Sequence, residues 1–213
     1  SYYYGHYKQP SVNYDKIEPY INKYLSKEDI TEEDKFLAYD QKQTFGLEAA
    51  TILWHFNVRG EACYNLTEDV DGTDPWVHNN SIQWLAGFDI DLPIWNMNVN
   101  VQETGTYILG NDKITDSATE LFDVDYNVNG YSNNKIVANI TTSFKNDQIL
   151  PELTVMYGIE NGDLVVMPKI VVKPTSELAL TASGMYLWNK DDNSEFAGWN
   201  KNNFVQLGAC LSF

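Results

Sequence analysis

The chain has 213 residues, which is enough for one large domain or two small ones. Its 14 lysines and arginines against 30 aspartates and glutamates give a formal net charge of -16, which argues against nucleic acid as a partner, because a duplex-binding surface must be basic. Two cysteines, Cys63 and Cys210, are too few for a disulfide scaffold, and no stretch approaches the ~18 apolar residues of a membrane helix.

Apolar and polar residues alternate along much of the chain, and this period of two predicts β-strands. Most of the segments have roughly the 9 to 11 residues that a tilted strand needs to cross a bilayer. We therefore expect an all-β, antiparallel, single domain over residues 1–213. The ten predicted strands are residues 1–7, 43–53, 57–66, 81–92, 97–109, 135–144, 152–160, 163–173, 178–188 and 203–213.

The longest connection, residues 8–42, is predicted to be partly helical. Pro19 suits a first helical turn, and Ile21, Tyr24 and Leu25 follow at the spacing of an amphipathic helix. Thr31 to Asp34 resembles a helix-start pattern. We expect this segment to cap the rim of the sheet; the alternative is that it folds inward as a constriction.

The next long connection contains an acidic stretch and a histidine. Asp69, Asp71 and Asp74 supply the hard oxygen ligands that suit Ca²⁺, but Gly72 comes too early for an EF-hand, so we expect a solvated acidic turn and no metal site. His78 follows these carboxylates. An aspartate that orients this histidine would make a hydrolytic site at the rim, and this is a minor alternative.

The connections sort by length. Residues 54–56, 93–96, 145–151 and 174–177 make short turns at one end of the predicted sheet. Residues 8–42, 67–80, 110–134, 161–162 and 189–202 lie at the other end, and four of these five are long. Alternation alone equally fits a soluble sandwich or a soluble barrel with an apolar interior. The sorting favours a transmembrane β-barrel, which has short periplasmic turns and long extracellular loops.

Alternation also predicts a lipid face and a lumen face. In 81–92 the lipid face would hold Trp84, Phe88 and Ile90. The charged residues of the opposite face would line a polar pore, or else would pair and plug a closed lumen. These predicted pore-lining residues are Glu48, Arg59, Glu61, Asp89, Asp91, Lys169 and Lys173.

Two residues resist strict alternation. Glu103 falls on the lipid side of its strand, so we expect a bulge that shifts the phase, or a position near the outer rim. Pro168 falls inside a strand, where its missing N–H costs a ladder hydrogen bond, so a bulge is expected there too.

The C-terminal stretch QLGACLSF resembles the β-signal of bacterial outer-membrane proteins, with Gln206, Gly208, Leu211 and Phe213 in its characteristic places. The resemblance implies a porin-like barrel in the bacterial outer membrane, inserted by the barrel-assembly machinery and surrounded by lipid and lipopolysaccharide. Ten strands would form a complete small barrel or the C-terminal part of a larger one.

These observations lead to an expected function. We expect a channel for passive diffusion of small solutes, not an enzyme, with no cofactor and with acidic loops that favour cations. A homo-oligomer is a further expectation. The alternatives are a closed structural or adhesive barrel that presents residues 8–42 and 110–134 to partners, a rim-active protease that uses His78, and a soluble β-sandwich that binds an apolar ligand.

Overall fold

The computed structural model describes residues 1–114, 131–190, 192 and 194–212. It is an all-β fold dominated by one antiparallel sheet of 10 strands. Each strand overlaps one predicted from the sequence, so the all-β prediction is confirmed. The strands are β1 (Tyr2–His6), β4 (Gln41–Leu53), β5 (Phe56–Thr67), β6 (Ser81–Leu92), β7 (Met97–Ile108), β8 (Ser132–Thr141), β9 (Ile149–Gly158), β10 (Leu164–Val172), β11 (Leu178–Trp188) and β12 (Phe204–Leu211).

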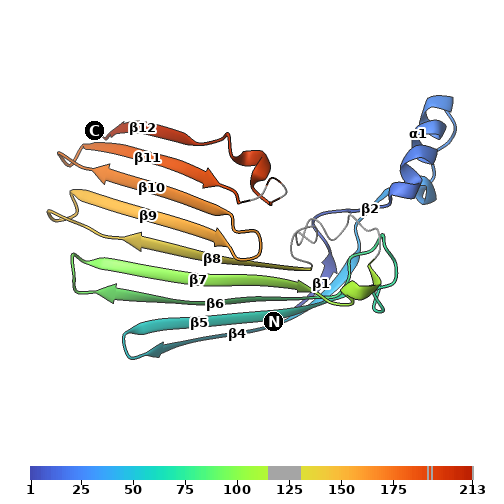
Figure 1. The fold of residues 1–213 in the computed structure, drawn as a ribbon, viewed down its shortest axis with the longest axis horizontal. Helices are drawn as coiled ribbons and strands as arrows, with labels where there is room; N and C mark the ends of the chain where they lie inside the picture. Colours follow the sequence, from blue (N-terminus) through green and yellow to red (C-terminus); the bar gives the residue numbers. More distant parts are fainter. Residues whose placement is uncertain (115–130, 191, 193, 213) are drawn as a thin grey trace.

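The sheet is an open meander in which strands adjacent in the chain are adjacent in space (Figure 1). It is not closed into a barrel. Among the described residues, β1 pairs in the sheet with β4 alone and β12 with β11 alone, so these two strands form its edges. The last contact of the β1 ladder joins Ser1 to Gly46, and β4 continues beyond it to Leu53.

The register of the ladders decides which side chains share a face, because paired residues point to the same side of a sheet. Trp84, for example, opposes Ala62 on one side and Gly105 on the other. Followed across all ten strands, the register collects mostly apolar side chains on one surface, here called the apolar face. Its members include Phe45, Leu47, Val58, Ile82, Trp84, Phe88, Ile90, Val99, Val101, Ile136, Ala138, Val155, Val166, Ile170, Leu180, Ala182, Val205, Leu207 and Leu211.

The opposite surface, here called the polar face, carries most of the amides, hydroxyls and charges of the strands. Asp89, for example, opposes Asn57 and Asn100. Polar members include Thr44, Glu48, Asn57, Arg59, Glu61, Asn65, Gln83, Asp89, Asp91, Asn98, Asn100, Gln102, Thr104, Thr106, Lys135, Asn139, Glu152, Thr154, Lys169, Thr181, Ser183 and Gln206.

Neither predicted bulge is present. Glu103 opposes Ala86 and Ile136 in unbroken register, and it lies in the middle of β7. Pro168 opposes Leu153 in an equally regular β9–β10 ladder. On its other side the β10–β11 pairs are missing only at Met167 and Pro168, and the same register resumes at Lys169. Both bulge predictions were therefore wrong. At Glu103 the ladder is unbroken, and at Pro168 the sheet loses ladder pairs without inserting a residue.

Connections sort to two ends of the sheet as predicted. Residues 54–55, 93–96, 142–148 and 173–177 form the turn end, on the left of Figure 1. The described parts of the other connections, residues 7–40, 68–80, 109–114 with 131, 159–163, and 189–190 with 194–203, form the loop end on the right. The short turns and the long connections therefore lie at opposite ends of the strands.

The first loop-end connection holds the predicted helix. It is α1 (Ile17–Ser26), with Pro19 in its first turn, and it stands clear of the sheet (Figure 1). No residue of α1 is buried, so the helix is not a constriction. The smaller elements are β2 (Ser11–Val12), η1 (Tyr14–Lys16), η2 (Glu32–Asp34) with the Thr31–Asp34 capping box, β3 (Leu37–Ala38), η3 (Asn111–Lys113) and η5 (Ala197–Trp199).

The small core lies on the polar face at the loop end. Among the described residues, the buried hydrophobic side chains are Ile108, Val165 and Leu187. The register places all three on the polar face, near the long connections. On the apolar face, by contrast, Leu207 is 80% exposed and Leu211 is 63% exposed. The structure therefore has no second layer of polypeptide over its apolar face within the described residues. No helix in that part of the chain has the length and apolar character to span a membrane.

Candidate functional site

The predicted pore-lining residues come together on one face of the sheet. Register places Glu48, Arg59, Glu61, Asp89, Asp91 and Lys169 on the polar face. Lys173 follows the last residue of β10 at the turn end, where its N–H donates to the carbonyl of Gln148. Four strands, β4, β5, β6 and β10, contribute the side chains that lie on this face, and the ladder register places them there.

Amide and ion-pair partners hold three of the predicted residues, Asp89, Asp91 and Lys169. Asn57 Nδ2 donates to Asp89 at 2.7 Å, and Asn98 Nδ2 donates to Asp91 at 2.8 Å. Lys169 Nζ donates to Glu152 at 3.1 Å, so this predicted residue is paired with a carboxylate that sequence reasoning missed. A surface of this kind presents hydrogen-bonding groups to water.

Glu48 and Glu61 face each other directly across the β4–β5 ladder. Like charges in opposite positions repel, and water or counter-ions must screen them. Arg59 lies two residues from Glu61 on the same face, yet no ion pair joins these three residues to one another or to other described residues. The charges of Glu48, Glu61 and Arg59 therefore require contact with water, as a water-filled lumen would provide.

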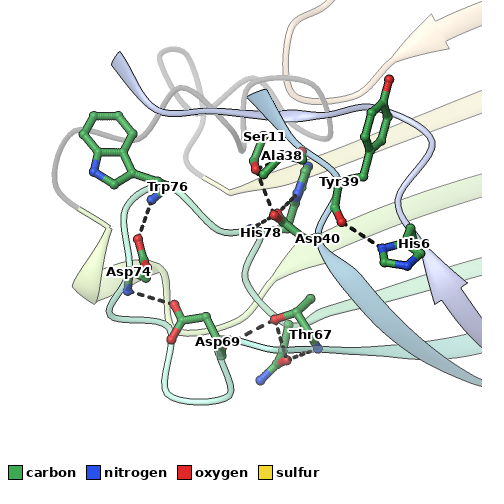
Figure 2. Close-up of polar contacts among 11 residues, drawn as sticks. His6, Ser11, Ala38, Tyr39, Asp40, Thr67, Asp69, Asp74, Trp76 and His78 are labelled. Atoms are coloured by element: carbon green, nitrogen blue, oxygen red, sulfur yellow. Dashed lines mark hydrogen bonds and ion pairs between the residues drawn. The ribbon is translucent and has the colours of Figure 1, made fainter. Parts of the chain in front are cut away.

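A buried polar cluster ties the loop end together (Figure 2). The Asp40 carboxylate accepts hydrogen bonds from the His78 backbone N–H at 2.9 Å, from His78 Nδ1 at 2.6 Å and from Ser11 Oγ at 2.8 Å. Tyr7 stacks on the His78 ring with centroids 4.0 Å apart. Burial raises the pKa of Asp40, but the hydrogen bonds from His78 and Ser11 outweigh it and hold the pKa below its ordinary value. The cluster joins the segments beside β1 and β4 to the connection before β6.

An aspartate does hold His78, but it is not one of the carboxylates at positions 69–74 that precede the histidine. Its partner is Asp40, which lies 38 positions away and carries no local sequence signal. His78 is 0% exposed, and its Nε2 is buried without a hydrogen-bond partner among the described residues. A general base must reach its proton directly or through one water. In this structure the His78 ring is closed off from solvent.

The acidic stretch considered as a weak Ca²⁺ site, Asp69, Asp71 and Asp74, forms hydrogen bonds within its own turn and to a neighbouring connection. Asp69 accepts from the backbone N–H of Asp74, and Asp74 accepts from the backbone N–H of Trp76, both at 2.9 Å (Figure 2). Asp71 contributes its backbone carbonyl to Lys113 Nζ. Over the described residues, no group of three or more His, Cys, Asp and Glu side chains is placed to hold a metal ion.

The residues that resemble an assembly signal lie in the edge strand β12. Gln206 opposes Ser183 and Gly208 opposes Thr181 on the polar face, whereas Leu211 opposes Leu178 on the apolar face. Phe213 lies outside the described residues. The strand thus presents alternate residues of the signal to the two faces.

No protein-family model, curated protein or solved structure matches the chain.

Proposed function

We propose that the ten-stranded sheet is the wall of a porin-like β-barrel in the bacterial outer membrane, through which small solutes diffuse passively. One observation carries this proposal: most apolar side chains of the ten strands share a face that no described part of the chain covers, while the buried hydrophobic side chains of the described residues lie on the polar face. A soluble sandwich or barrel has the reverse arrangement, with its core on the apolar side.

Hydrocarbon is the covering that the apolar face requires. Burying one large aliphatic side chain contributes about 1.5–3 kcal/mol, and monomeric soluble proteins rarely expose more than roughly 300–600 Å² of contiguous apolar surface. Aromatic residues also mark both ends of the face, as membrane interfaces favour. Trp54 and Trp95 lie at the turn end, and Tyr107, Tyr157, Tyr186 and Trp188 lie toward the loop end.

Closure is the step that the proposal adds to the fold. Each unpaired N–H or C=O at a sheet edge in lipid costs several kcal/mol, so β1 and β12 must find partners in a membrane. Pairing of these two edges would give a complete ten-stranded barrel. Pairing of these edges with further strands would instead make the sheet part of a larger barrel.

The charge distribution supports a preference for cations. Within the strands, the polar face holds five carboxylates and four cations, so the wall itself is close to neutral. The excess of acid behind the net charge of -16 therefore lies mostly in the connections. Acidic loops at the loop end would give the mouth a negative potential that attracts cations and repels anions.

A planar-bilayer measurement tests the channel. We expect folded protein to produce conductance steps, with a reversal potential in a KCl gradient of the sign that cation selectivity gives. Folding is checked independently, since a folded barrel in detergent migrates differently before and after heating. Absence of conductance from folded protein would remove the channel function.

The second candidate is a closed barrel that presents its loop end to a partner. The loop-end core over the polar face favours it, because that core narrows a lumen from one side. The exposed helix α1 also offers an apolar surface, with Tyr24 67% and Leu25 71% exposed. Deletion of residues 14–36 that abolishes partner binding and spares folding would support this candidate.

A further inference from the structure

We infer that Lys135 and Glu195 set the width and charge preference of the channel mouth, because they tie the connection between β11 and β12 across the polar face. This inference rests on the proposed channel function. It concerns the connection between β11 and β12, whereas the connection expected to cap or constrict the mouth holds the exposed helix α1.

The ion pair shows where the β11–β12 connection goes. Lys135 Nζ lies 2.7 Å from Glu195 Oε1, and Asn133 Nδ2 donates to Glu195 Oε2 at 3.3 Å. Both partners of Glu195 belong to β8, and the register places Lys135 on the polar face opposite Thr104. Because β9 and β10 separate β8 from β11, the connection reaches Lys135 across the loop end of those two strands.

A second attachment fixes the same connection. The Phe196 N–H donates to Asp163 Oδ2 at 3.0 Å, and Lys135 Nζ lies 5.9 Å from the Phe196 ring centroid. Asp163 is 1% exposed in the connection before β10. The backbone next to Glu195 is therefore held against the connection between β9 and β10.

Burial beneath the attachment supports the crossing. Val165 and Leu187 oppose each other in the β10–β11 ladder on the polar face, and they are only 5% and 7% exposed. Ser194, next to Glu195, is 7% exposed. If the polar face were fully solvated at this point, Val165 and Leu187 would be exposed. Their burial therefore indicates that the connection packs against β10 and β11 at the loop end.

The ion pair is exposed enough to act as a restraint that can be released. The side chains of Lys135 and Glu195 keep 25% and 33% of their exposure, and partly exposed pairs contribute little to global stability. Loss of the pair should loosen the connection around Glu195 without unfolding the sheet, while the hydrogen bond from Phe196 to Asp163 still anchors it. Each partner also neutralises the other, so removal of one leaves a net charge in the mouth.

The Glu152–Lys169 pair is a matched control. It lies on the same face with a 3.1 Å separation and comparable exposure, but both residues belong to neighbouring strands and no connection is attached to them. Glu152→Gln changes the charge of the wall by the same amount as Glu195→Gln and releases no segment.

The experiment combines polymer exclusion with ion selectivity in planar bilayers. Glu195→Gln and Lys135→Met should both admit larger polyethylene glycols than the unmodified protein. Their cation-to-anion permeability ratios should move in opposite directions, down for Glu195→Gln and up for Lys135→Met. Each ratio should change by about thirtyfold, because a unit charge about 4 Å away in water changes the local concentrations of cations and of anions by roughly five- to sixfold in opposite senses. The swap Lys135→Glu with Glu195→Lys should restore the polymer limit, and Glu152→Gln should leave that limit unchanged.

The possible outcomes separate the role of the ion pair from the channel function itself. Conductance with an unchanged polymer limit in both single variants would overturn the inference and leave the channel intact. Absence of conductance from the unmodified, folded protein would instead overturn the channel function. Should Glu195→Gln misfold, Glu195→Asp withdraws the carboxylate by one methylene, and it should raise the polymer limit by a smaller amount; an unchanged limit there also contradicts the inference.

Discussion

Glu103 is a carboxylate on an apolar face, and the indole of Trp84 accounts for how it is held there. Trp84 Nε1 donates to both carboxylate oxygens, at 3.1 and 2.9 Å. Gly105 makes this approach possible, since a Cβ at that position would lie 2.2 Å from the Trp84 ring. Within the ten strands, Glu103 is the single Asp, Glu, Lys or Arg on that face.

Substitution of Glu103 separates its charge from its hydrogen bond. Glu103→Gln keeps an acceptor for Trp84 and removes the charge, so the free energy of unfolding in lipid vesicles should be unchanged or higher. Glu103→Leu leaves the indole N–H without a partner in an apolar setting. This loss should lower the free energy of unfolding by about 1–3 kcal/mol. Urea unfolding followed by tryptophan fluorescence measures both. Equal stability of the two variants would contradict the role assigned to the pair.

Asp40 makes the loop end sensitive to acid. Because its pKa in the folded protein lies below the ordinary value of 3.8, its stabilisation is present above that value and is lost as the pH falls through the folded pKa. The His78 amide should therefore lose protection from hydrogen exchange below about pH 4. Asp40→Asn should lower that protection already at neutral pH and abolish its acid dependence. Unchanged protection in the variant would show that another contact holds the segment.

At the scale of elements, alternation locates the strands well where polar and apolar residues differ clearly. The predicted bounds of β6 match the observed ones, Ser81–Leu92. The predictions for β8 and β9 lie about three residues too far along the chain, because the turn between them starts earlier. Lys145, Asn146 and Asp147 adopt positive φ there, and Pro151 lies inside β9 although it suggested a turn.

Side-chain partners across connections were beyond sequence reasoning. Asp40 and His78 meet only because β4 begins beside the connection that precedes β6. Glu195 reaches Lys135 over two intervening strands, a contact between positions 60 apart. Alternation assigns a residue to a face, but the path of a long connection depends on tertiary contacts that no local pattern encodes.

Pro168 weakens one ladder in a way that a substitution should repair. The missing β10–β11 pairs at Met167 and Pro168 place the absent N–H opposite Gly184. Pro168→Val supplies that donor and keeps an apolar side chain, so it should raise the free energy of unfolding by about 0.5–1.5 kcal/mol. Ile170→Val, on the same face of β10, is the control and should not raise it. A loss of stability in Pro168→Val would show that the proline is required where it stands.

At the scale of the whole molecule, the two faces of one strand should respond oppositely to charge. Ala182 lies on the apolar face opposite Leu207, and the next residue, Ser183, lies on the polar face opposite Gln206. Arginine at a lipid-facing midplane position costs about 2–4 kcal/mol, so Ala182→Arg should destabilise the protein in vesicles by that amount. Ser183→Arg should change stability little. Equal losses would indicate that both faces meet the same surroundings.

The most direct test is the environment of β6 in a bilayer. Spin labels are placed singly from residue 82 to residue 91 in a variant that lacks Cys63 and Cys210, and the protein is reconstituted into vesicles. Lipid contact predicts that labels at Ile82, Trp84, Ala86, Phe88 and Ile90 are accessible to oxygen, and that labels at the alternate positions are accessible to a water-soluble nickel reagent. Even-numbered positions shielded from both reagents would place polypeptide over the apolar face and contradict the account.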